Sequence, residues 1–343
     1  MQVTENLEPA LRRLRGDYHW LWIDAICINQ QDVEQRNQQV LRMKDIYSKA
    51  ERVLVWTGPE TEDSSRAIDL LDLLSSGSNP ERDSAMKGSW VERYRGPFKK
   101  EWRALYNFTR RPYWFRTWII QELVVGEDVL ILCGPRAISW ERLNSALTLL
   151  DEACNFDMHN NMEGLMLLRA VNECHQVYRL GRTVRDQNMY RIMASLFNIM
   201  SSSYVADSTN PRDKIYALLG FTENGSTLVP HPDYSLKLEE IFILLTVAWL
   251  RKGWDAALIT CRAVLWRDRS DLRSWTPDYL EAWTKASLTP KHLEIYFDHV
   301  TREQLFATPG TTPIISYSPI NKTLTIRGRI IDTVDGLSAT CNL

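Results

Sequence analysis

The sequence predicts an α/β fold for the N-terminal part of the chain, with a parallel sheet covered by helices on both faces. Three observations lead to this class: residues 1–135 alternate helical patterns with short apolar runs, each run is apolar at every position, and helices separate the runs. Parallel strands are buried on both faces and need crossover helices, so this pattern favours a parallel sheet. In such sheets a ligand binds beyond the carboxyl ends of the strands.

The first expected strand, near residues 20–24, lies between two helical patterns. Its centre is the aromatic and β-branched run at 20–23, which is typical of a buried strand. Apolar residues recur at helical spacing on both sides of it: Leu7, Leu11 and Leu14 before it, and Val33, Val40, Met43, Tyr47 and Ala50 after it. Asp32 stands three residues before Gln35, so a capping box is expected to begin the second helix.

Two more strands and three more helices are expected before residue 136. The strands are the apolar runs near 53–57 and 128–133. Helical spacing predicts the helices at 67–77, 102–108 and 113–125. Each strand after the first would therefore follow at least one crossover helix.

Composition excludes several classes of function. The chain has 343 residues, with 41 Lys and Arg against 43 Asp and Glu, and a formal net charge of −2. This balance gives no field that would attract nucleic acid or an anionic membrane. The longest apolar run, 241–250, is about half of the ~20 residues that span a bilayer. We therefore expect a cytoplasmic protein that binds neither nucleic acid nor membrane.

The cysteines give no sign of a metal site. Six Cys are scattered without CxxC spacing, as expected for reduced thiols. Cys154, His159, Cys174 and His175 could surround a metal, but their spacing matches no zinc pattern. Ordinary helix residues are the better interpretation, and no metal is expected.

Polar side chains follow the first expected strand directly. Asp24, Cys27 and Asn29 would lie at the carboxyl edge of the sheet, where they could line a binding cleft. Local physics offers a plainer interpretation, in which Asp24 and Asn29 cap a turn and Cys27 packs inward. Both interpretations stay open on the residues alone.

A carboxylate shares a helical row with two indoles in the last expected helix before residue 126. Trp114, Trp118 and Glu122 are four residues apart, so a continuous helix would place them on one face. Desolvation by the indoles would raise the pKa of Glu122 and prepare it for proton transfer or for stabilising a developing cation. The alternative is a solvated glutamate at a helix end beside aromatic packing.

Long sequence blocks carry a family resemblance. LWIDAICINQQD, VLRMKDIYSKAERVLVWTG and WFRTWIIQEL closely resemble, in order and spacing, the signature blocks of the fungal heterokaryon-incompatibility (HET) domain. NPRDKIYALLGF, PDYS, SWTPDY and LTIRGRIIDTV look like segments that commonly follow this domain in large fungal HET proteins. The resemblance spans most of the chain.

The resemblance implies a fold and an activity. HET domains are similar to Toll/interleukin-1 receptor (TIR) domains, which have a flavodoxin-like parallel sheet and, where enzymatic, cleave NAD with a glutamate. The segment from Trp118 to Glu122 resembles the TIR segment that carries this glutamate, which makes Glu122 the implied catalytic residue. Asp24, Cys27, Asn29 and Trp118 would line the pocket. NAD would be the substrate, and no cofactor would be required.

The implied biology is nonself recognition that ends in programmed cell death. The expected partners are further copies of the chain or another signalling protein. An alternative from a different class is a non-catalytic, self-associating signalling module. A further alternative is an inactive truncated paralogue.

The chain departs from the family pattern at its start. HET domains usually begin with a strand that this sequence lacks, so we expect a TIR-like sheet without its first strand. Three regions are expected: an incomplete HET domain at 1–136, a helical region at 137–235, and a truncated α+β region at 236–343.

The region beyond residue 136 is read as mainly helical with a few strands. Helical spacing covers 162–200 and 239–252, and alternation predicts a strand at 323–331. Asn210, Pro211 and Asp213 have the pattern of an N-cap, a first-turn proline and an acidic third residue. For Arg212 and Asp213 an ion pair or a cap is preferred over a functional site.

Overall fold

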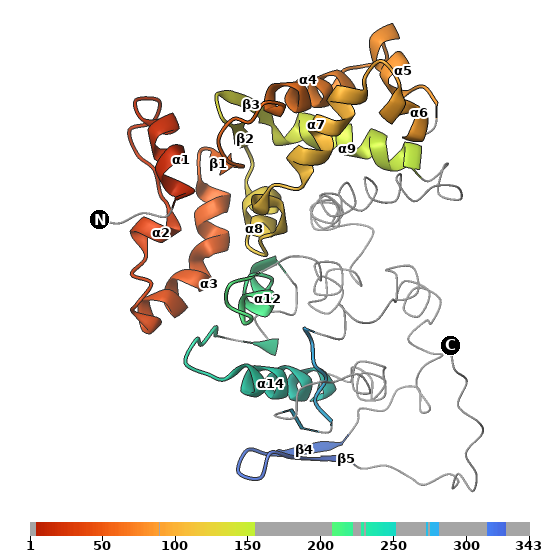
Figure 1. Ribbon diagram of the computed structural model, residues 1–343. Coiled ribbons are helices and arrows are strands. Elements are labelled where there is room, and N and C mark those ends of the chain that lie inside the picture. Colours follow the sequence, from red (N-terminus) through yellow and green to blue (C-terminus); the bar gives the residue numbers. More distant parts are fainter. Residues whose placement is uncertain are drawn as a thin grey trace, which may run out of the picture. The chain divides into compact units, whose positions relative to one another are not determined.

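The computed structural model of the chain is shown in Figure 1. It describes residues 5–88, 90–154, 208–221, 228–229, 231–251, 272–273, 275–280 and 314–326. The chain divides into two compact units, Met1–Leu238 and Glu239–Leu343. The expected helix at 162–200 and the residues His159, Cys174 and His175 lie outside the described residues.

The first unit holds a small mixed sheet of three strands in the order β1-β2-β3, namely β1 (Val53–Trp56), β2 (Val129–Cys133) and β3 (Arg136–Ser139). β1 and β2 run parallel with Val53 opposite Val129, whereas β2 and β3 form an antiparallel hairpin. The strands predicted near 53–57 and 128–133 are confirmed, and so is their parallel pairing. The hairpin makes the described sheet mixed rather than purely parallel.

The prediction of a strand near residues 20–24 is wrong. Residues 20–23 form no strand, and Trp20 is 94% exposed. The Ile23 carbonyl accepts hydrogen bonds from the Ile26 and Cys27 amides, at 2.9 and 2.8 Å, and the chain turns there into the short helix α2 (Asp24–Cys27). A short apolar run becomes a strand only where a neighbouring strand pairs with its backbone, and β1 has its described partner on β2.

Helices α1 (Leu7–Leu14) and α3 (Val33–Lys49) form where the spacing predicts them. The Asp32 carboxylate accepts a hydrogen bond from the Gln35 amide at 3.0 Å, which is the expected N-cap. The Gln35 side chain accepts from the Asn29 amide at 2.8 Å and not from that of Asp32. In a capping box the Gln35 side chain would accept from the Asp32 amide. Here it accepts from an amide three residues earlier, so only the Asp32 half of the expected box forms.

The core of the first unit lies between the sheet and a layer of helices. α4 (Ser64–Ser75) packs against α7 (Lys99–Thr109) and α9 (Trp140–Cys154). Shorter helices, α5 (Pro80–Met86) and α6 (Trp90–Arg95), connect α4 to α7. Side chains of these helices are fully buried, for example Ile68, Leu71, Trp102, Leu105 and Ala146. The predicted helices at 67–77 and 102–108 are confirmed.

The single helix expected at 113–125 is interrupted. Pro112 opens a short 3-10 helix, η1 (Pro112–Phe115), and Arg116 then has an extended backbone, with φ −78° and ψ 132°. The α-helix α8 begins only at Ile119 and ends at Val125. Because the helix is broken, residues four apart across the break do not share a face.

The carboxyl ends of β1 and β2 are tied together. The Gly134 amide donates to the Gly58 carbonyl at 3.0 Å. The Arg111 guanidinium donates to the carbonyls of Thr57 and Pro59 at 3.2 and 3.0 Å. These bonds hold the loop that follows β1 against the end of β2.

The end of the first unit contains the short helices α12 (Asp213–Tyr216) and η2 (Leu219–Phe221). The expected N-cap at Asn210 is wrong, because the residue before α12 is Arg212 and it makes no side-chain cap. Instead the Asn210 side chain accepts from the Arg212 amide at 3.1 Å, which closes a turn ahead of the helix.

In the second unit, α14 (Leu238–Arg251) confirms the helix expected at 239–252. β4 (Ile315–Ser318) pairs antiparallel with β5 (Thr323–Ile326), which confirms the first part of the strand predicted at 323–331. The Thr246 and Tyr279 hydroxyls lie 2.8 Å apart. Within the described ranges of both units, no helix is long and apolar enough to cross a membrane.

Candidate functional site

Glu122 lies half-buried on α8, which packs beside α3 (Figure 1). Its Oε2 accepts a hydrogen bond from the Tyr113 hydroxyl at 2.7 Å. The expected row of Trp114, Trp118 and Glu122 is wrong, because Trp114 belongs to η1 and not to α8. The Trp114 indole is buried and donates to the Phe108 carbonyl at 2.9 Å instead.

Burial sets the protonation behaviour of Glu122. Desolvation raises its pKa, and the charge of Asp24 adds to that rise. The charge of Arg116 and the hydrogen bond from Tyr113 act in the opposite direction, but the net pKa is still raised. Asp24 on α2 therefore lies within electrostatic range of Glu122 on α8.

Two tyrosines complete this site, which we call the Glu122 cluster: Asp24, Tyr47, Tyr113, Arg116 and Glu122. Burial raises the pKa of Tyr47 and of Tyr113 well above the ordinary value, and the charge of Glu122 raises both further. Both phenols therefore stay protonated at neutral pH, and the Tyr113 hydroxyl donates its hydrogen bond to Glu122.

The charge balance of the Glu122 cluster suits a cation. Two carboxylates and one guanidinium leave one net negative charge when all three are ionised. Desolvation strengthens the field that this charge creates. A positively charged group, or a positive charge that develops during a reaction, would be stabilised beside Glu122 and Asp24.

The remaining candidate residues have other surroundings. The Asn29 side chain accepts from the Gln31 amide at 3.1 Å, so it caps the turn before α3. Cys27 is an exposed free thiol at the end of α2. Trp118 is half-buried at the N-cap position of α8, and its indole N–H is hydrogen-bonded to Asp213. A role for these three in a pocket stays a prediction.

Sequence reasoning missed Tyr47, Tyr113 and Arg116. Tyr47 entered it only as an apolar position of a helix, and Tyr113 is nine residues from Glu122, which is no regular helical spacing. The break at Arg116 brings the Tyr113 hydroxyl back to Glu122. Among the described residues, no group of His, Cys, Asp and Glu could hold a metal ion.

Comparison with known proteins supports the class that the sequence blocks and this α/β unit suggest. Residues 1–122 match the family described as Heterokaryon incompatibility protein (HET), and we call this matched part of the chain the HET segment. The match confirms the resemblance and ends at Glu122.

A curated relative extends the similarity. The chain is 28% identical over 336 residues to heterokaryon incompatibility protein 6, OR allele, of Neurospora crassa. The alignment covers 81% of this chain and 48% of that protein, so the chain spans about half the length of this relative. No solved structure matches the chain.

Proposed function

We propose that this protein acts in heterokaryon incompatibility, the rejection of a nonself partner after fungal cells fuse. The HET segment and the Neurospora crassa relative support this role. Its outcome would be regulated death of the fused cell. The HET segment would be the effector part of the chain, because the Glu122 cluster lies in it.

The chemistry that we propose for the effector is hydrolysis of NAD. The bond between the nicotinamide nitrogen and the ribose breaks, and its electron pair leaves with nicotinamide. Water attacks the positively charged ribose carbon and gives ADP-ribose and a proton. Such glycosidic bonds open through an oxocarbenium-like transition state, which a nearby carboxylate stabilises.

The observation that carries this proposal is the half-buried Glu122 carboxylate, whose pKa burial raises and the charge of Asp24 raises further. Tyr113 would hold the Glu122 carboxylate in one orientation through its 2.7 Å hydrogen bond. Arg116 would favour the ionised form, because the guanidinium opposes part of the rise in the Glu122 pKa. The ionised carboxylate could then face the developing ribose cation.

The proposal is tested by expressing the chain and its Neurospora-type relatives in a fungal host and following NAD and viability. Glu122→Gln keeps the size and the hydrogen bond to Tyr113 but removes the charge. Glu127→Gln is the matched control, because Glu127 is exposed two residues after α8 ends. NAD loss and death that survive Glu122→Gln would refute the enzymatic reading.

A second candidate function is a non-catalytic module that signals by self-association. It is favoured by an exposed apolar stretch in which Trp20 is 94%, Trp22 38% and Ile26 39% exposed. Exposed apolar patches of this kind mark interaction surfaces. Light scattering tests it: Trp20→Ser with Trp22→Ser should convert an oligomer to a monomer and abolish death while NAD stays constant.

A further inference from the structure

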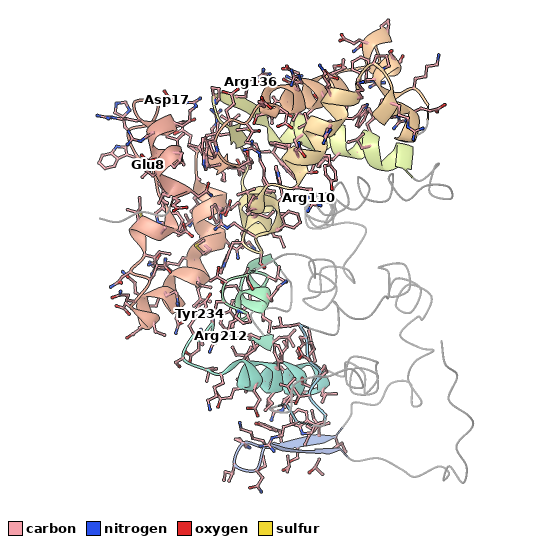
Figure 2. The ribbon with its side chains drawn as sticks, viewed as in Figure 1. Glu8, Asp17, Arg110, Arg136, Arg212 and Tyr234 are labelled. Atoms are coloured by element: carbon pink, nitrogen blue, oxygen red, sulfur yellow. The ribbon has the colours of Figure 1, made fainter. Side chains whose placement is uncertain are left out.

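The segment made of residues 210–221 and 231–236 lies beyond the HET match, yet it packs on the helices that carry the Glu122 cluster. We call this segment the brace; Figure 2 labels its residues Arg212 and Tyr234. On α3, the Asn37 side chain accepts from the Tyr234 amide at 3.0 Å. The Arg36 guanidinium lies 3.9 Å from the centre of the Tyr234 ring, which is a close cation–π contact.

The brace also holds α8 directly. Gln121, the neighbour of Glu122, is 1% exposed and its side-chain amide donates to the Ala217 carbonyl at 2.9 Å. Gly220 allows this close approach, because a Cβ there would lie 3.2 Å from Lys44 Cβ and 3.5 Å from Gln121 Nε2. A side chain at Gly220 would therefore crowd Lys44 on α3, whereas its Cβ would make an ordinary contact with Gln121 on α8.

Asp213 connects the parts of the brace to the start of α8. Its Oδ1 accepts from the Tyr234 hydroxyl at 2.5 Å, and its carboxylate also binds the Trp118 indole at the N-cap position of α8. Inside the brace, the Tyr216 hydroxyl donates to the Asp233 carbonyl at 2.9 Å. These hydrogen bonds therefore join the two short motifs of the brace, at 210–221 and 232–235.

From these contacts we infer that the brace fixes α8 against α3, with Asp213 and Gln121 as positioning residues that set the place of Glu122. Trp118 and Gln121 lie about one helical turn apart, and both contact the brace. Glu122 comes directly after Gln121, so these two contacts fix its position. The other members of the cluster include Asp24 on α2 and Tyr47 on α3. Loosening the brace would therefore open the Glu122 cluster to water.

The inferred unit is thus larger than the family match. Residues 1–122 alone would lack the acceptor of the Gln121 amide and the partner of the Trp118 indole. Leaving the buried Gln121 amide without an acceptor is costly. The effect of the brace on activity rests on the proposed function, whereas its hold on α8 does not.

The hold on α8 is tested by hydrogen–deuterium exchange on the full chain. Asp213→Asn retains the size of the side chain but replaces the carboxylate by an amide. The Tyr234 hydroxyl and the Trp118 indole then lose the charged acceptor that they share. Amide exchange over α8 should become at least about tenfold faster, while α4 stays unchanged. Asp69→Asn is the control, because Asp69 on α4 pairs with Arg136 of β3 at 2.5 Å and has no part in the brace.

A second variant protects the test against a chain that fails to fold. Tyr234→Phe deletes only the hydroxyl that donates to Asp213 and should give the same pattern with a smaller change. Unchanged exchange over α8 in either folded variant would overturn the inference. An equal rise over α4 and α8 would also overturn it, because that pattern reports general destabilisation.

A readout at Glu122 itself separates positioning from mere structural support. In protein with carbon-13-labelled glutamate, the Glu122 carboxyl resonance is the one that Glu122→Gln removes. Water entry in Asp213→Asn should move its titration midpoint down towards that of exposed glutamates, and an unmoved midpoint would overturn the inference. If NAD cleavage proves insensitive to Glu122→Gln, the proposed function fails, while exchange and titration still decide the role of the brace.

Discussion

Arg111 fixes the carboxyl edge of the sheet, and its removal should weaken the first unit measurably. Besides the Thr57 and Pro59 carbonyls, its guanidinium donates to the Thr61 and Ser64 hydroxyls at 3.3 and 2.8 Å. A net contribution of about 1 kcal/mol from each of the three shorter bonds gives a loss of ~3 kcal/mol for Arg111→Ala. In a unit of this size that corresponds to a fall in Tm of roughly 6–12 °C.

The assay is thermal unfolding followed by circular dichroism. Arg110→Ala is the matched control, because among the residues that the structure describes the Arg110 guanidinium contacts only the Tyr106 side chain, by a 3.1 Å hydrogen bond and a cation–π contact. Surface contacts of this kind contribute ~0.5 kcal/mol or less. Equal Tm values for the two variants would refute the reasoning that Arg111 ties the loop to the sheet.

Three further predictions concern single positions. Gly134→Ala should cost at least about 2 kcal/mol in a denaturant titration, because φ is +55° and a Cβ would lie 2.7 Å from the Glu60 amide nitrogen; a loss below ~0.5 kcal/mol would contradict it. Glu122→Gln should unfold at the same Tm as the wild type or higher at pH 7. Folding raises the Glu122 pKa, so burying its charge lowers stability as pH rises above the ordinary glutamate value of ~4.3, and the advantage of Gln should vanish below it. Trp20→Ser should change the free energy of unfolding by less than ~0.5 kcal/mol, because Trp20 is 94% exposed, and a larger loss would show a buried indole.

The sequence predicted the elements whose patterns are set locally. β1 and β2 are apolar at nearly every position, and each is flanked by Gly or Pro turns and helices, so their identity does not depend on distant residues. The N-cap at Asp32 also depends only on its own next three residues. These features could be predicted because the physics that fixes them acts within a few residues.

Features that depend on distant partners could not be predicted in the same way. Residues 20–23 have the composition of a strand, but no neighbouring strand pairs with them in the described fold. The contact between Tyr113 and Glu122 depends on a break in the helix at Arg116. A continuous 3.6-residue period would have placed Trp114, not Tyr113, near the carboxylate.

The candidate site shows both cases. The topology rule led us to expect Asp24 and Glu122 at the same edge of the sheet, but no described strand precedes Asp24, so that reason is wrong even though the charge of Asp24 contributes to the raised pKa of Glu122. Asn29 instead caps its own turn, which is the plainer of the two interpretations that its sequence context allowed. The contact between Trp118 and Asp213 joins residues 95 positions apart, and no local pattern signals it.

The measurement that tests the central claim most directly is NAD turnover by the purified full chain and a matched pair of variants. The charge of the half-buried Glu122 is proposed to stabilise the opening ribose cation, so Glu122→Gln should lower NAD turnover on the order of 100-fold. Glu127→Gln should leave turnover unchanged, and both variants should unfold at or above the wild-type Tm at pH 7. NAD turnover that is equal in the wild type and in folded Glu122→Gln would contradict the account.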